Sequence, residues 1–103
     1  MRILIIEDDK TIAGQLALLL EKSGYEVQVL DDFSTVVEDV LASHAHLLLL
    51  DIILPIHDGY YICRQIRKTS QIPIIMVTSR TNEIDELTSM HLGADDFITK
   101  PYH

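Results

Sequence analysis

The sequence has few of the features that mark secreted, membrane-bound or nucleic-acid-binding proteins. It has a single cysteine, Cys63, which excludes an internal disulfide and a cysteine-based zinc site. Only 8 lysines and arginines stand against 16 aspartates and glutamates, and the net charge of −8 argues against this chain alone binding a polyanion such as DNA. There is no charged-then-apolar leader and no long apolar run. We therefore expect a cytoplasmic protein without a membrane segment.

What is present is typical of a folded domain. The hydrophobic content is 48%, and no low-complexity tract, linker or repeat interrupts the chain. A chain of 103 residues is long enough for one core but short for a complete α/β unit. We therefore expect one domain over residues 1–103.

The prediction of the fold depends most on the segment 46–51, His-Leu-Leu-Leu-Leu-Asp. Four consecutive leucines cannot form one face of an amphipathic element, so both sides of the segment must be covered. This pattern favours a central strand of a parallel sheet, although a buried helix segment has the same pattern. The run ends at Asp51, and Pro55 soon after it cannot continue a ladder. Asp51 is thus expected at the carboxyl end of a strand, where open α/β sheets bind ligands.

The rest of the chain alternates between strand-like and helix-like patterns. We expect further strands at 1–6, 25–30, 72–77 and 97–98. Four helices are expected between the strands, each with apolar residues at helical spacing. These residues are Ile12, Leu16, Leu19 and Leu20 in the first helix, Val37, Val40 and Leu41 in the second, Ile62 and Ile66 in the third, and Ile84, Leu87 and Met90 in the fourth. This β-α order, which lacks only a last helix, predicts a parallel sheet with helices on both faces.

Short polar residues and glycines are expected to delimit these helices. Asp8 or Asp9 is a candidate N-cap for the first helix, Ser34 for the second and Asp58 for the third. Gly59 is expected to serve the turn before the third helix. The first helix is expected to end at Gly24 as a left-handed cap, and the fourth helix is expected to end at Gly93.

Acidic and polar side chains gather where the strands end. Glu7 and Asp8 follow the first strand, Asp51 the third and Thr78 the fourth, while Lys100 lies just beyond the last. Three converging carboxylates repel one another, and a divalent cation such as Mg²⁺ relieves the repulsion. Thr78 and Lys100 can then bind two oxygens of a phosphoryl group whose third oxygen contacts the metal. An aspartate in such a site can act as a nucleophile and form an acyl phosphate.

Five segments of the chain make it similar to the receiver domain of two-component response regulators. They are residues 5–9 (Ile-Ile-Glu-Asp-Asp), 50–55 (Leu-Asp-Ile-Ile-Leu-Pro), 58–59 (Asp-Gly), 77–79 (Val-Thr-Ser) and 93–101 (Gly-Ala-Asp-Asp-Phe-Ile-Thr-Lys-Pro). The resemblance covers the whole chain and implies a doubly wound, flavodoxin-like α/β fold. Its five-stranded parallel sheet would have the order 2-1-3-4-5, and the chain would end before the fifth helix. The last segment resembles the OmpR/PhoB-type subfamily, whose receivers precede a winged-helix DNA-binding domain.

The resemblance implies a role for each matching residue of the acidic site. Asp51 would be the phosphoacceptor, with Asp8 a direct magnesium ligand and Glu7 a ligand through water. The backbone carbonyl of Ile53 would also reach the metal. Thr78 and Lys100 would bind the phosphoryl group.

Further residues acquire roles from the same resemblance. Phe97 would occupy the aromatic switch position, and Asp95 and Asp96 would belong to a dimer surface. Arg80 would lie where the family tunes the lifetime of the phosphoryl group. The Lys100–Pro101 bond is expected to be cis.

The function implied is a phosphorylation-operated signalling switch that takes a phosphoryl group from a sensor histidine kinase. The protein would phosphorylate and dephosphorylate itself with Mg²⁺ but would not be a turnover enzyme. It would form a homodimer on phosphorylation and control transcription through a DNA-binding domain absent from this chain. Without a fifth helix, one face of the sheet should expose apolar surface.

Other interpretations compete with these. If each residue is considered in isolation, Asp51 would be a cap or turn residue at a strand end and Lys100 a solvated surface lysine. Phe97 would then be an ordinary residue of the hydrophobic core. Cys63 is expected to pack as a small hydrophobe, and none of the five histidines has zinc-site spacing. A phosphohydrolase with an aspartate nucleophile usually has a second carboxylate two residues after it, which acts as the general acid. In this sequence that position is Ile53, whose side chain cannot transfer a proton. A docking module that binds no magnesium is the third possibility.

Overall fold

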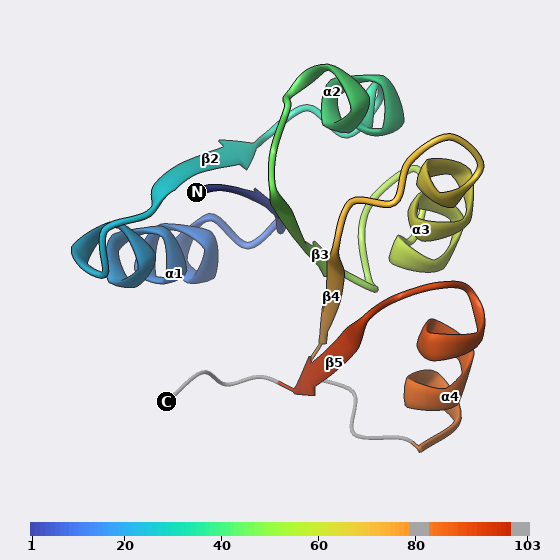
Figure 1. The fold of residues 1–103 in the computed structure, drawn as a ribbon. Coiled ribbons are helices and arrows are strands. Elements are labelled where there is room, and N and C mark those ends of the chain that lie inside the picture. Colours follow the sequence, from blue (N-terminus) through green and yellow to red (C-terminus); the bar gives the residue numbers. More distant parts are fainter. Residues whose placement is uncertain (79–82, 100–103) are drawn as a thin grey trace.

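The structure, a computed structural model, describes residues 1–78 and 83–99, with the backbone alone for 83–85 and 99. The predictions for Arg80, Lys100 and the Lys100–Pro101 bond therefore lie outside the described residues. The described chain alternates strands and helices as predicted (Figure 1). The elements are β1 (Arg2–Ile6), α1 (Lys10–Lys22), β2 (Glu26–Leu30), α2 (Val36–Ala42), β3 (Leu47–Asp51), α3 (Gly59–Arg67), β4 (Ile74–Thr78), α4 (Glu83–His91) and β5 (Asp96–Thr99).

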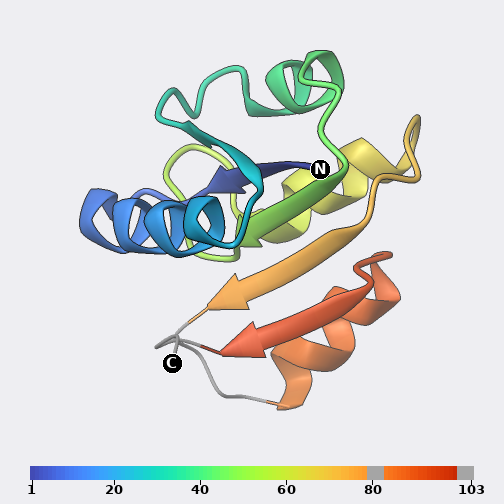
Figure 2. The same cartoon turned by 60° about the vertical axis from the view of Figure 1, so that its left-hand side comes forward.

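The five strands form one parallel sheet in the order β2-β1-β3-β4-β5, which confirms the predicted α/β fold. Helix α1 lies on one side of the sheet, and α2, α3 and α4 lie on the other (Figures 1 and 2). Because the strands are parallel, their carboxyl ends meet at one edge of the sheet.

The four-leucine segment is the central strand β3 and not a buried helix. Leu48 and Leu50 have no exposed surface and belong to the core beneath α2 and α3. Leu49 points to the opposite side and packs in the cluster under α1. The alternation of a strand thus sends successive leucines into two different cores, which explains why the segment has no polar face.

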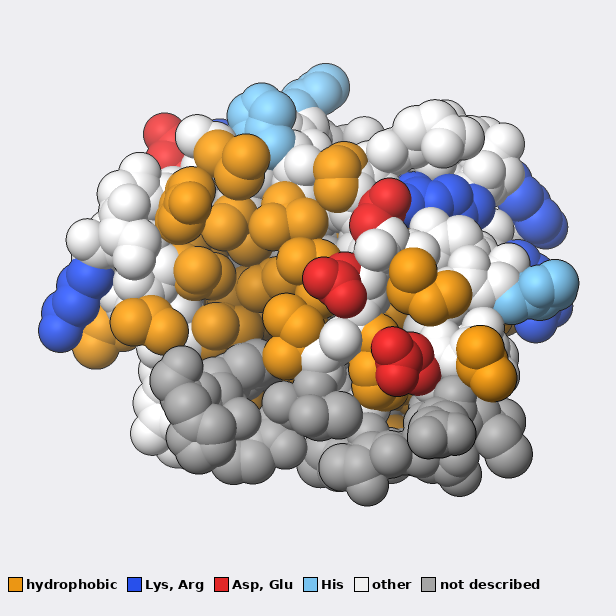
Figure 3. All heavy atoms as spheres, turned by 60° about the horizontal axis from the view of Figure 1, so that its bottom comes forward, with side chains coloured by type: hydrophobic (Ala, Val, Ile, Leu, Met, Phe, Trp, Pro, Cys, Tyr) orange, Lys and Arg blue, Asp and Glu red, His pale blue; other side chains and the backbone are white. Residues whose placement is uncertain are grey.

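The side of the sheet that carries α1 exposes apolar side chains, as expected. Ile98 of β5 is 41% exposed, and its strand partner Val77 belongs to the cluster under α1. Figure 3 shows hydrophobic side chains gathered over a broad area of this side. The prediction that Leu19 faces the core is wrong, since it is 53% exposed while Ala13 and Ala17 are buried.

Two of the three predicted helix caps are confirmed. The Asp9 carboxylate accepts the N–H groups of Thr11 and Ile12 at 3.0 and 3.1 Å, and that of Asp58 accepts the N–H of Tyr61 at 2.9 Å. These bonds satisfy backbone donors that a helix start leaves unpaired.

The predicted cap of α2 is wrong by one residue. Thr35 occupies the N-cap position and makes no side-chain cap bond. The hydroxyl and N–H of Ser34 donate to Asp32 instead, at 2.6 and 3.0 Å. These two bonds lower the pKa of the Asp32 carboxyl, because they stabilise its charged form.

Arg67 at the end of α3 joins segments that are distant in the sequence. Its guanidinium donates to the carbonyl oxygens of Gly93 and Ile72 at 2.8 and 2.6 Å. It also pairs with the Asp95 carboxylate at 2.9 Å, and the same carboxylate oxygen accepts the N–H of Ile74 at 2.8 Å. Arg67 thereby fastens α3 to the start of β4 and to the loop before β5, a link that no local sequence pattern indicates.

Replacing Arg67 by methionine should lower the free energy of unfolding by about 1–2 kcal/mol. The aliphatic stem would remain, but the partly buried carbonyls and Asp95 would lose their donor. Denaturation in urea measures the change, with Arg64→Met as the matched control. Arg64 lies one turn earlier on α3 and is exposed, so equal losses in the two variants would contradict this role of Arg67.

Candidate functional site

The acidic residues named from the sequence meet because their strands are neighbours. Ile6 of β1 pairs with Leu50 of β3, so the next residues, Glu7 and Asp51, stand at the same level of the sheet edge. Asp51 in turn pairs with Val77 of β4, and Thr78 follows as the last residue of that strand. Thr78 is fully buried.

Glu7, Asp8 and Asp51 form a cluster that fits a metal ion. One carboxylate oxygen from each lies within 4.8 Å of the others. Among the described residues no other group of three or more acidic, histidine or cysteine side chains meets this condition. Glu7 and Asp51 are 5% and 6% exposed, whereas Asp8 is exposed, so the cluster opens to solvent on one side.

Backbone N–H groups orient two of these carboxylates. Glu7 Oε2 accepts the N–H of Asp9, and Asp51 Oδ1 accepts the N–H of Ile53, both at 3.2 Å. Three carboxylates this close to one another repel, and a hard cation with oxygen ligands is the usual remedy. The donor set suits Mg²⁺, which takes few carboxylates and keeps positions for water and a phosphoryl oxygen.

Gly59, the first residue of α3, lies directly against the backbone of Asp51 and Ile52. Its N–H donates to the carbonyl oxygen of Ile52 at 2.7 Å. A Cβ atom on Gly59 would collide with the carbonyl oxygen of Asp51 and would lie 2.8 Å from Cα of Ile52. The sequence predicted that Gly59 serves a turn. The structure shows that a glycine is required here because α3 begins directly against the strand end that carries Asp51, which leaves no room for a side chain.

Phe97, Asp95 and Asp96 lie at and before β5. Phe97 is half-buried and packs against the core on the side of α3 and α4. Its N–H is bound by the Asp96 carboxylate at 2.8 Å. The carboxylate of Asp95 is already held by Arg67 and by the N–H of Ile74, a structural role that the sequence did not reveal.

Cys63 is buried in α3, with Sγ 3.6 Å from the carbonyl oxygen of Leu92. Burial raises the pKa of its thiol, because the thiolate would lose its hydration, while nearby Arg67 opposes the rise. The prediction that Cys63 packs as a small hydrophobe is confirmed. None of the described helices is both long and apolar enough to cross a membrane.

Comparison with known proteins assigns the chain to a protein family. The sequence profile described as "Response regulator receiver domain" matches residues 3–103. The chain is 44% identical over 100 residues to the sensory transduction protein RegX3 of Mycolicibacterium smegmatis. It is 41% identical over 103 residues to the response regulator protein GraR of Staphylococcus haemolyticus. These alignments cover 97% and 100% of the chain but 44% and 46% of the relatives, so the chain spans about half of their length.

Solved structures agree with this assignment. The BeF3-activated N-terminal receiver domain of Klebsiella pneumoniae RstA superposes with a TM-score of 0.94 and 32% identity, over 100% of this chain and 88% of that one. A two-component response regulator from Clostridium difficile gives a TM-score of 0.93 and 28% identity, over 100% and 85%. The curated relatives are regulators of the OmpR/PhoB type. The chain belongs to the response regulator receiver domain family.

Proposed function

We propose that the chain is a phosphorylation-operated switch whose phosphoacceptor is Asp51. The observation that carries the proposal is the convergence of the Glu7, Asp8 and Asp51 carboxylates within 4.8 Å at the end of the central strand. Its family supplies the signalling context. The donor would be the phosphohistidine of a sensor kinase in the cytoplasm.

The transfer needs one nucleophile and compensation of negative charge. A carboxylate oxygen of Asp51 attacks phosphorus as the P–N bond to the donor histidine breaks, and the electron pair of that bond leaves with the imidazole. The product is an acyl phosphate on Asp51. Glu7, Asp8 and Asp51, with the carbonyl of Ile53, would hold Mg²⁺, which neutralises charge on the transferred group.

The switch would then act through the residues around the acyl phosphate. Thr78, fully buried at the end of β4, and Lys100 would bind phosphoryl oxygens. Phe97 would change its packing, and with it the surface of α4 and β5 that carries Asp95 and Asp96. A homodimer on that surface, and control of transcription by a DNA-binding domain beyond this sequence, complete the proposal.

Incubation with a small phosphodonor and Mg²⁺ tests the proposal. We expect the intact mass to increase by one phosphoryl group that is lost at high pH, since acyl phosphates are labile to base. The Asp51→Asn variant should show no gain, and Asp58→Asn, which alters an acidic helix cap, should behave as the wild type. A gain retained in Asp51→Asn would refute the role of Asp51, and steady hydrolysis of a free phosphoester would favour a phosphohydrolase instead.

A further inference from the structure

The loop between β3 and α3 contains a backbone conformation that its sequence does not favour. Ile56 has a φ of 70°, and the N–H of His57 donates to the carbonyl oxygen of Pro55 at 2.8 Å. This is a three-residue γ-turn of the rare, strained kind, and a β-branched residue at positive φ is an outlier. Ile56 is 68% exposed, so burial of its side chain does not offset the strain. Other contacts must therefore keep the turn in this conformation.

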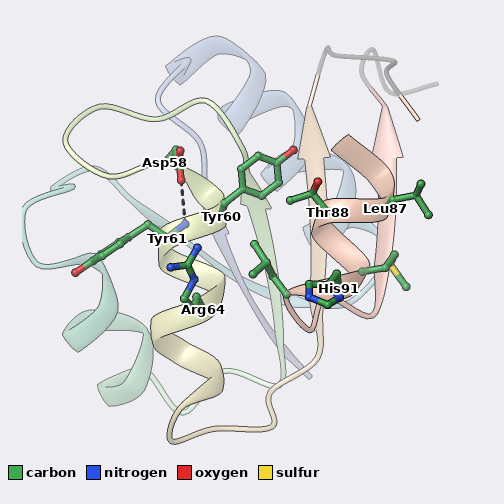
Figure 4. Close-up of a pocket in the computed structure, with 9 residues that line it drawn as sticks. Asp58, Tyr60, Tyr61, Arg64, Leu87, Thr88 and His91 are labelled. Carbon is green, nitrogen blue, oxygen red and sulfur yellow. Dashed lines mark hydrogen bonds between the residues drawn. The ribbon is translucent and has the colours of Figure 1, made fainter. Parts of the chain in front are cut away.

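An aromatic contact holds the far end of the turn. The ring of His57 stacks on that of Tyr61, with the ring centroids 4.2 Å apart and the planes inclined by 21°. Tyr61 lies in the first turn of α3, where its N–H is bound by the Asp58 carboxylate (Figure 4). Its side chain points away from α4, unlike that of neighbouring Tyr60, and lines a small hollow between α2 and α3 together with His57. The stack thus fastens the γ-turn to the helix that begins against Asp51.

A stiff segment connects this turn with Ile53, the proposed backbone ligand of the metal. Only Leu54 and Pro55 separate Ile53 from Ile56. The ring of Pro55 fixes its φ, and Leu54, which precedes the proline and packs against the core, is largely restricted to extended conformations. At its other end Ile53 is held by the Asp51 carboxylate, which accepts its N–H at 3.2 Å. The direction of the Ile53 carbonyl therefore depends on the position of the turn.

We propose that the His57–Tyr61 stack positions the carbonyl of Ile53 for the metal ion by holding the strained turn at Ile56 in place. His57 and Tyr61 are thus positioning residues, which act through Ile53 and not by touching the metal. This role rests on the proposed function, in which Ile53 is a metal ligand. Loss of either ring should then release the turn, and relief of the strain at Ile56 should make the stack dispensable.

Hydrogen exchange in the metal-free chain tests whether the stack holds the turn. The amide of His57 should exchange at least about fivefold faster in Tyr61→Ala than in the wild type, because the turn opens more often. Tyr25→Ala is the matched control and should leave this rate unchanged. Tyr25 is 39% exposed and Tyr61 40%, but Tyr25 precedes β2, at the amino ends of the strands. An unchanged rate in Tyr61→Ala would overturn the proposal.

The second measurement is the dissociation constant of Mg²⁺, obtained from thermal unfolding at a series of Mg²⁺ concentrations. His57→Ala and Tyr61→Ala should each weaken Mg²⁺ binding about three- to tenfold, since a ligand loses the contact that orients it. The double variant should bind no more weakly than either single variant, because both changes remove the same stack. His57→Phe keeps an aromatic ring and should bind Mg²⁺ as the wild type does. Additive losses in the double variant, or equal losses in His57→Phe and His57→Ala, would contradict a role of the stack.

Relief of the strain gives a test that general destabilisation cannot imitate. Glycine adopts positive φ without strain, so Ile56→Gly added to Tyr61→Ala should restore the Mg²⁺ affinity to within about twofold of the wild type. Ile56→Val keeps a β-branched residue in the turn and should restore nothing. Equal Mg²⁺ affinities of the two combined variants would overturn the link between the strain and the stack.

The last arm separates this role from the proposed function. With a small phosphodonor and saturating Mg²⁺, Tyr61→Ala should gain one phosphoryl group as the wild type does. Half-maximal gain in the variant should need about three- to tenfold more Mg²⁺, because metal binding is weakened and the nucleophile is intact. An unchanged Mg²⁺ requirement would overturn the positioning role alone. An absent mass gain in the wild type would count against the proposed function, and the Mg²⁺ affinities of the variants would still decide the positioning role.

Discussion

Replacing Gly59 by alanine should lower the free energy of unfolding by about 3 kcal/mol. The added methyl group would collide with the backbone carbonyl of Asp51 and approach Cα of Ile52, and neither can move as the end of a flexible side chain would. Either α3 or the end of β3 must shift. Because that strand end carries the proposed phosphoacceptor, we expect phosphorylation by a small phosphodonor to be slower as well.

A matched control is available in α1. Gly14 is also helical, but a Cβ atom there would meet no atom within 4 Å. Gly14→Ala should therefore raise stability by about 0.5–1 kcal/mol, the usual difference between the two residues in a helix. Urea denaturation of both variants measures the contrast. A Gly59→Ala variant as stable as the wild type would show that the start of α3 is not packed tightly against the backbone of Asp51.

The second large effect concerns Asp8, whose replacement by asparagine should weaken Mg²⁺ binding by roughly 10- to 100-fold. The same variant should be more stable than the wild type without metal, because one of three clustered carboxylates loses its charge. Mg²⁺ should then stabilise the wild type strongly and the variant weakly. Thermal unfolding across a series of Mg²⁺ concentrations gives both quantities.

Glu21→Gln provides the control for net charge. It removes one negative charge from an exposed position of α1, away from the cluster. We expect its Mg²⁺ dependence to match that of the wild type. If Asp8→Asn and Glu21→Gln lose the same amount of stabilisation, the metal would act through general screening and not through a site.

The features that could be predicted from the sequence are those that depend on the residues of one short segment. A four-leucine run without a polar face requires cover on both sides, and an acid at its end places Asp51 at the ligand edge of a parallel sheet. The same reasoning places Glu7 and Asp8 after β1. Adjacent parallel strands then bring these acids together, as the cluster confirms.

The features that the sequence did not reveal depend on contacts between distant segments. Arg67 resembles any lysine or arginine in the last turn of a helix, yet it binds residues up to 28 positions away. Gly59 looks like a turn residue until its distance to Asp51 is known. Leu19 and Leu87 follow helical spacing but are exposed, because spacing alone does not say which neighbour, if any, covers an apolar stripe.

The most direct test of the account is to locate a bound divalent cation, using the broadening of backbone amide NMR signals by Mn²⁺. We predict that broadening centres on Glu7, Asp8, Asp51 and Ile53, that excess Mg²⁺ reverses it, and that Asp8→Asn greatly weakens it. Broadening centred on other exposed acids, such as Glu38 of α2, with none at the end of β3, would contradict a metal site beside the phosphoacceptor.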